Sequence, residues 1–139
     1  MRAETIDDVL EMLAAIVADT LAEPDPLGYF PALYRQVTLK VKDGIDHGRF
    51  DDGPRMARFD ASFANAYFEA YEKFRAGKQP GLAWQFAFDR SRSGGLIILQ
   101  NLLLGINAHI NLDLGVVTGK AFPGRELDDF HGDFNTIND

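Results

Sequence analysis

Hydrophobic residues recur every three or four positions through most of this sequence, which is the spacing of one buried face of an α-helix. The first such region follows Thr5, whose hydroxyl is suited to cap a helix, and it carries Asp7 and Asp8 in its first turn. It leads into the connector EPDPLG. The pattern therefore predicts a first helix that begins at Ile6 and stops before Glu23.

Three more helices are predicted before residue 95. One begins at Pro31 and extends to about Ile45, although its segment VTLKV also alternates as a short strand would. The helical spacing fits a longer window there, so we favour the helix. A strongly amphipathic helix begins at Pro54 and ends at Gly77, and a shorter one lies within PGLAWQFAFDRS.

The segment LIILQNLLLGINAHINLDL, from Leu96 to Leu114, is the most apolar region, and its last residues alternate between polar and apolar. A strand here would have almost no partner strands, so we predict a helix. On a helical wheel, His109 and Asp113 are neighbours on one side, and Asn107 and Asn111 lie opposite. We expect this helix to be central and buried. VVTGKAFPGRE then resembles a loop, and LDDFHGDFNTIND starts helical.

Together these elements predict an all-α fold, a single-domain helical bundle of five or six helices over residues 1–139. A chain of 139 residues suits one domain with its own core. The net charge of −7 disfavours nucleic acid as a partner, and the absence of cysteine excludes thiolate chemistry. No secretory signal is visible, and polar residues interrupt the most apolar segment. We therefore expect no membrane span and a cytoplasmic location.

His109 and Asp113 are the main candidates for chemistry. The pair fits three roles: ligands of one divalent metal such as zinc, an acid–base pair in which Asp113 orients His109, or a structural hydrogen bond. Asp60 and Tyr67, near the apolar face of the third helix, are candidate binding residues, with Asp60 as an optional third metal ligand. Asn107 and Asn111 are expected to hold the bundle together and are further candidates for binding.

Three other features have weaker claims to a functional role. His131 and Asp133 form the only other close pair of a histidine and an acid, and we expect them to lie in a surface turn. His47, in a glycine-rich segment, is expected to be exposed. Gly105 indicates either close helix packing or space for a ligand above His109.

The sequence resembles a bacterial family of uncharacterised proteins, domain of unknown function 5995. The resemblance rests on LGYFPALYRQVT, DGIDHGRFDDGPRMARFDASFANAYFEA, LQNLLLGINAHINLDLG and the closing DFNTIND. It implies a helical fold and no reaction, and it indicates that NAHINLDLG is the site. The resemblance also implies that relatives continue past the end of this chain, so we expect either a short natural member or C-terminal helices that are missing or supplied by another chain. A weaker similarity links the H-x-x-x-D spacing to helical zinc-dependent phospholipase C and nuclease-like proteins.

Two functions are consistent with these residues. The first is a small-molecule enzyme, with hydrolysis as one candidate reaction, whose His109 and Asp113 act with or without a metal cofactor. The second is a non-enzymatic ligand- or partner-binding module in which the polar residues form a structural network. A small-molecule ligand and a homo-oligomer or partner chain are the expected partners. The substrate and reaction class stay open at this level.

Overall fold

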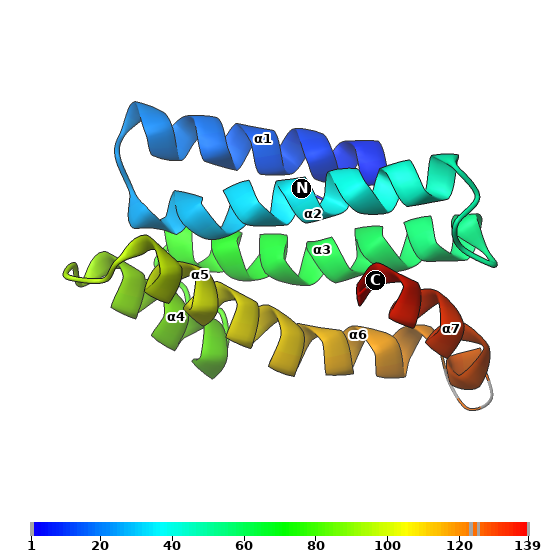
Figure 1. Cartoon of the computed structure of the whole chain (residues 1–139). Coiled ribbons are helices and arrows are strands. Elements are labelled where there is room, and N and C mark those ends of the chain that lie inside the picture. Colours follow the sequence, from blue (N-terminus) through cyan, green and yellow to red (C-terminus); the bar gives the residue numbers. More distant parts are fainter. Residues whose placement is uncertain (1, 123, 125, 139) are drawn as a thin grey trace.

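The computed structural model describes residues 2–122, 124 and 126–138, and in that part of the chain every regular element is a helix. The α-helices are α1 (Ile6–Ala22), α2 (Tyr29–Asp46), α3 (Gly53–Arg75), α4 (Leu82–Arg92), α5 (Ile98–Ala108), α6 (Leu114–Ala121) and α7 (Glu126–Asn138). A 3-10 turn, η1 (Pro26–Gly28), precedes α2, and a π-helical turn, η2 (His109–Asp113), joins α5 to α6 without a break. Six helical rods therefore pack together (Figure 1), which confirms the all-α prediction.

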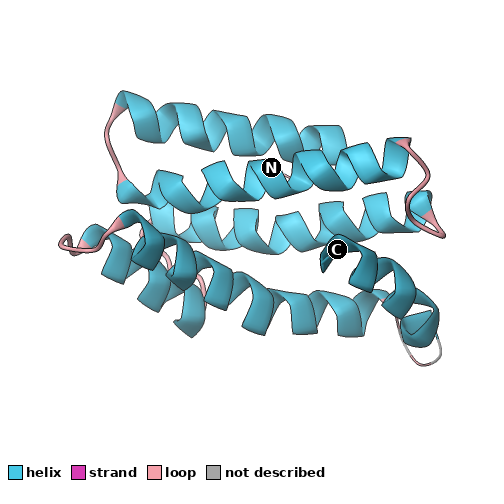
Figure 2. Cartoon of the chain, in the orientation of Figure 1, coloured by secondary structure: helices cyan, strands magenta, loops and turns pink. Residues whose placement is uncertain are grey.

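Local capping explains where the predicted helices begin. The Thr5 hydroxyl accepts the backbone N–H of Asp8, and the Asp8 carboxylate accepts the N–H of Thr5 in return, so α1 starts at the predicted residue. Asp52 caps α3 by accepting the N–H of Arg55. The VTLKV segment is helical, as the longer pattern indicated. Only short loops separate the helices (Figure 2).

Helix α3 is the centre of the bundle. It packs against α1, α2, α4, α6 and η2, and Figure 1 shows it between the α1–α2 pair and the α4–α6 row. Aromatic and small apolar side chains dominate its buried face: Met56, Phe59, Ala61, Phe63, Ala64, Tyr67 and Phe68. The prediction that the segment around Leu96–Leu114 is the central buried helix is therefore wrong, because α3 takes that place.

The rod formed by α5, η2 and α6 lies at the surface of the bundle and is longer than predicted. Six large apolar side chains along this rod are exposed: Ile98, Leu99, Leu103, Ile110, Leu112 and Val116. Both flanks of this rod are apolar, so the sequence pattern could not distinguish the inner face from the outer one. Val116–Ala121 are helical, so the predicted loop was wrong there, and its residues 123 and 125 lie outside the described residues.

The same rod passes a simple test for membrane-spanning helices. Among the described residues, Ile98–Ala121 is long and apolar enough to cross a bilayer by length and composition alone, and 28% of its most apolar part is buried in the bundle. Since core helices of water-soluble proteins pass the same test, this is weak evidence for a membrane. It qualifies the expectation that the chain has no span.

Candidate functional site

A buried histidine and a buried aspartate meet on the inner face of the π turn. His109 Nδ1 lies 2.9 Å from Asp113 Oδ2, and the side chains are 3% and 8% exposed. Trp84 of α4 donates its indole N–H to the same oxygen over 2.9 Å. Because a carboxylate only accepts, Nδ1 carries the proton and Nε2 keeps its lone pair. The predicted pairing of these two residues is confirmed.

Burial sets the charge of His109. It disfavours the imidazolium and lowers the pKa of His109, although the hydrogen bond and charge of Asp113 act in the opposite direction. The ring is therefore neutral at neutral pH, with Nε2 as its basic nitrogen. The Nε2 atom has no hydrogen-bond partner among the described residues.

Aromatic rings from α2 and α3 fix the orientation of His109. Phe63 of α3 stacks on the imidazole with centroids 3.7 Å apart, and Tyr34 of α2 meets it edge-on at 4.7 Å. Phe30 lies 5.6 Å away and also packs on Gly105, where an added Cβ would come within 2.5 Å of its ring. Close packing of α2 on α5 therefore accounts for Gly105, rather than space for a ligand.

An apolar cavity of about 260 Å³ opens beside this histidine, between α2, α3, η2, α6 and α7. Val37 and Ile110, which are 43% and 45% exposed, lie at its solvent side. The polar side chains in its lining are Tyr34, Asp60 and His109, and the remainder are apolar: Phe30, Leu33, Val37, Val41, Met56, Phe59, Phe63, Ile106, Ile110, Leu114, Phe134 and Ile137. A mostly apolar cavity with a few polar groups is the usual form of a small-molecule site.

Each of the three polar side chains in the lining has a buried atom without a partner. These are Tyr34 Oη, Asp60 Oδ2 and His109 Nε2. Burial raises the pKa of Asp60 to about 7. Burial also raises the pKa of Tyr34 well above its usual value, with further contributions from the charges of Asp60 and Asp113. An unpaired buried polar group costs about 1–3 kcal/mol, so three around one cavity mark it as a place where water molecules or a ligand supply the missing partners.

Tyr67 is buried beside this site. Its ring centroid lies 6.3 Å from that of His109, and its hydroxyl also has no partner among the described residues. Asn107 and Asn111 lie on the opposite, exposed face, as the helical wheel predicted, but Asn111 Nδ2 donates only to Asn107 Oδ1. The prediction that the two amides hold the bundle together is wrong, because both residues are exposed and their amide groups bond to each other.

The residues proposed as metal ligands do not form a ligand set. No group of three His, Asp or Glu side chains among residues 2–122, 124 and 126–138 is placed to hold one ion. Asp60 therefore does not complete a site with His109 and Asp113. His47 and His131 are exposed, as expected for surface residues.

Asp133 is buried and bonded to residues around the start of α3, whereas the sequence predicted a surface turn at this position. It is 1% exposed and accepts from Arg55 Nη2 at 2.9 Å and from the backbone N–H groups of Asp51 and Asp52. Burial opposes its ionisation, but these partners together outweigh it and lower the pKa of Asp133. Its position three residues after Phe130 and just before Phe134 on the apolar stripe of α7 was the available signal.

Trp84 was also missed as a member of the site. It is the only tryptophan in the chain and is 2% exposed. A buried indole N–H requires an acceptor, and this requirement was the signal that it would meet a carboxylate.

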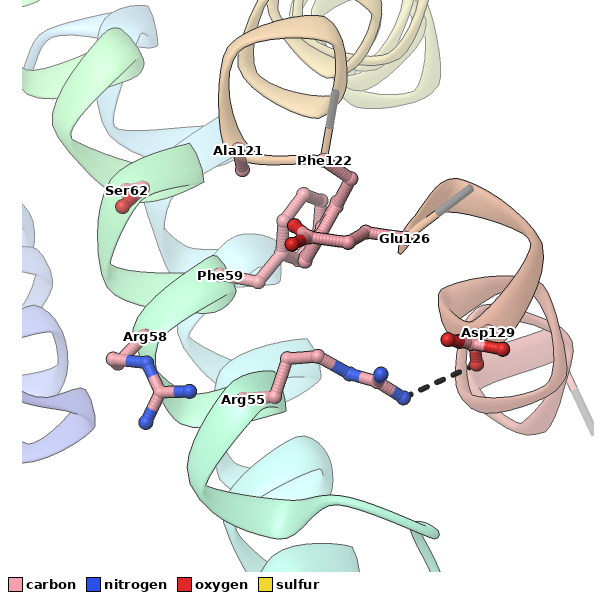
Figure 3. A pocket seen from close by; sticks show the side chains of 8 residues that line it. All are labelled: Arg55, Arg58, Phe59, Ser62, Ala121, Phe122, Glu126 and Asp129. Carbon is pink, nitrogen blue, oxygen red and sulfur yellow. Dashed lines mark hydrogen bonds between the residues drawn. The ribbon is translucent and has the colours of Figure 1, made fainter. Parts of the chain in front are cut away.

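A second hollow, of about 410 Å³, lies between α3 and α7 and is shown in Figure 3. Arg55 and Arg58 border it on one side and Glu126 and Asp129 on the other, and Arg55 donates to the backbone oxygen of Asp129 at 3.1 Å. Arg58, Glu126 and Asp129 are exposed to solvent, which already hydrates their charges. The apolar cavity at His109 is therefore the better candidate for a ligand site.

Comparison with known proteins gives a family and no activity. A family model described as "Family of unknown function (DUF5995)" matches residues 6–139, nearly the whole chain. No curated protein sequence and no solved structure matches the chain significantly.

Proposed function

The chain belongs to the family of unknown function DUF5995, and we propose that it is a small-molecule enzyme in which His109 acts as a general base. One observation carries this proposal: a buried, neutral imidazole has Nδ1 bound to Asp113 and a partnerless Nε2, and it lines an apolar cavity. A base held in a fixed tautomer by a carboxylate is a recurring arrangement in acid–base catalysis.

His109 and Asp113 have separate roles in this proposal. Nε2 of His109 accepts a proton from a substrate hydroxyl, from an activated C–H group or from a water molecule. The imidazolium that forms is stabilised by the adjacent Asp113 carboxylate, which keeps Nδ1 as the protonated nitrogen throughout. Trp84 positions Asp113 through the indole hydrogen bond, and stacking of Phe63 prevents rotation of the imidazole.

The surroundings favour a basic Nε2 at neutral pH. Because the pKa of His109 is lowered, the unprotonated form is present below the usual titration range of histidine. The apolar lining keeps bulk water from Nε2, so that only a water molecule admitted together with the substrate reaches this atom, and it strengthens electrostatic interactions with a bound substrate. Asp60 and Tyr34 serve as binding residues at the polar end of the cavity. Hydrolysis of an apolar substrate fits this environment, with the water molecule as the proton donor.

A second function, ligand binding without turnover, is favoured by the close covering of Nε2. This atom exposes less than 1 Å² to solvent, so a substrate reaches it only when side chains of the lining move. A module that stores or senses a small molecule needs the cavity and the unpartnered groups, whereas it does not need access to a base. The two functions differ in whether His109 is required for conversion or only for binding.

The test is a panel of apolar esters, lactones and epoxides, incubated with the protein and followed by mass spectrometry. Wild type is compared with His109→Gln and with the control Asn111→Ala, which changes a polar residue on the exposed face of the same rod. The enzyme proposal predicts turnover that falls about 100-fold or more in His109→Gln and stays unchanged in Asn111→Ala. Binding of panel compounds without turnover would favour the binding module. Turnover that survives His109→Gln would refute the role of His109 as general base.

A further inference from the structure

The polar end of the apolar cavity contains acidic side chains and no lysine or arginine among the described residues. Asp60 lines it, and Asp113 is bonded to the His109 ring. Burial raises the pKa of the Tyr34 hydroxyl, and the charges of Asp60 and Asp113 raise it further. A ligand that brings a further negative charge to this end would be repelled.

Asp60 lacks the partner that a buried carboxylate needs. Its residue is 7% exposed, and its Oδ2 atom has no hydrogen-bond or ionic partner among the described residues. Buried charges in proteins are normally paired, because desolvation of an isolated carboxylate is costly. The Oδ2 atom exposes less than 1 Å², so a cation in the cavity would supply the missing partner after side chains of the lining move, and it would restore the ionised form of Asp60.

The walls around Asp60 suit an organic cation rather than a metal ion. The aromatic rings of Phe30, Tyr34, Phe59 and Phe63 line the same cavity, and π faces attract ammonium groups. By contrast, these walls provide few of the oxygen and nitrogen ligands that a metal ion requires. The net charge of −7 additionally attracts cations toward the protein.

We infer that the cavity binds an apolar organic ammonium compound, whose charged nitrogen pairs with the Asp60 carboxylate. The apolar body of this ligand lies against Met56, Leu114 and Phe134, which line the cavity from α3, α6 and α7. The inference rests on the proposed function, since it assigns a substrate class to the same site. Tyr34 lies close to both His109 and Asp60. Its ring centroid is 4.7 Å from that of His109, and the charge of Asp60 contributes to the raised pKa of its hydroxyl.

The test measures binding, by titration calorimetry at about pH 8, of three probes that share one ring and differ in charge. They are phenethylamine, phenethyl alcohol and phenylacetate. Wild type is compared with Asp60→Asn and with Glu11→Gln, which removes one negative charge from the exposed face of α1. We expect wild type and Glu11→Gln to bind the amine at least about 10-fold tighter than the alcohol. In Asp60→Asn this preference should disappear.

Three results would overturn the inference: an alcohol or carboxylate bound as tightly as the amine, no binding of any probe, or an amine preference that survives Asp60→Asn. His109→Gln separates this inference from the proposed function. It should retain the preference for the amine, because Asp60 is intact, while it loses any turnover. Turnover of neutral substrates without amine preference would refute the inference and leave the proposed function standing.

Discussion

Two buried aspartates in this bundle have opposite surroundings. Asp133 on α7 is bonded to the Arg55 guanidinium and two backbone N–H groups, and its pKa is lowered. Asp60 on α3 has an unpartnered oxygen, and its pKa is raised to about 7. Burial acts against ionisation at both positions, so the partners decide the outcome. Asp133 stabilises the fold, whereas Asp60 costs stability and lies where a ligand could use it.

The largest effect is expected from Asp60→Asn, and its size depends on pH. The pKa of Asp60 is about 7 in the folded protein against 3.8 when unperturbed, so the folded state holds the proton more tightly. The stability that this proton contributes is fully present at pH values below the pKa of Asp60 in the unfolded state. It is lost as the pH rises through the pKa of Asp60 in the folded state. The shift corresponds to at most about 4 kcal/mol.

Urea unfolding of wild type and Asp60→Asn, from about pH 4 to pH 8, measures this effect. The free energy of unfolding of the variant should exceed that of wild type increasingly as pH rises, and the difference should level off above the pKa of about 7. Taking the difference between the two proteins cancels the opposing contribution of His109. A difference that does not change with pH would show that Asp60 is paired or solvated.

Asp133→Ala should destabilise the protein by about 3 kcal/mol. The substitution leaves the Arg55 guanidinium and the N–H groups of Asp51 and Asp52 without their acceptor, and it loosens α7 from the start of α3. Chemical denaturation at neutral pH measures the loss. At neutral pH, Asp133→Ala should lower the free energy of unfolding, whereas Asp60→Asn should raise it. Changes of the same sign in both variants would contradict the difference between these two aspartates.

Trp84→Phe should cost about 1–2 kcal/mol, because it removes one of two hydrogen bonds to the buried Asp113 while it retains most of the ring packing. Thermal unfolding followed by circular dichroism gives the change in Tm. The cost should vanish or change sign in an Asp113→Leu background, in which the indole N–H has lost its acceptor at residue 113. Equal costs in both backgrounds would mean that packing alone accounts for Trp84.

The smallest effect is expected from Asn111→Ala, within about 0.5 kcal/mol of wild type. Its amide donates only to Asn107, and both residues are exposed on the outer face of the rod. Denaturant midpoints of the two proteins compare them directly. A loss above about 1 kcal/mol would indicate that the amide pair is covered by another surface in solution.

The sequence predicted much of the fold because helical spacing, caps and glycine stops are local signals. Thr5 and Gly77 marked helix ends through their own chemistry, and the one-turn spacing of His109 and Asp113 predicted their contact. The direction in which the α5–α6 rod faces depends on which helices cover it. Because tertiary packing decides this, the predictions made from the sequence for Asn107, Asn111 and the central helix were wrong.

The candidate site was predictable only in part for the same reason. His109, Asp113 and Asp60 stood out as polar residues on or beside apolar faces. Trp84 and Asp133, in contrast, depend on partners that are 29 residues away at Asp113 and 78 residues away at Arg55. No local pattern identifies such partners. The cavity itself is formed by side chains of several helices, so its existence required the packed structure.

The most direct test of the account is the protonation state of His109, measured by nitrogen NMR of the labelled imidazole ring. His109→Gln assigns the signal among the three histidines, of which His47 and His131 are exposed. We predict that the ring is neutral at neutral pH, with the proton on Nδ1 and none on Nε2. Because its pKa is lowered from 6.5, the ring should still be neutral at pH values at which an ordinary histidine begins to take up a proton. A proton on Nε2 at neutral pH would contradict the general-base role.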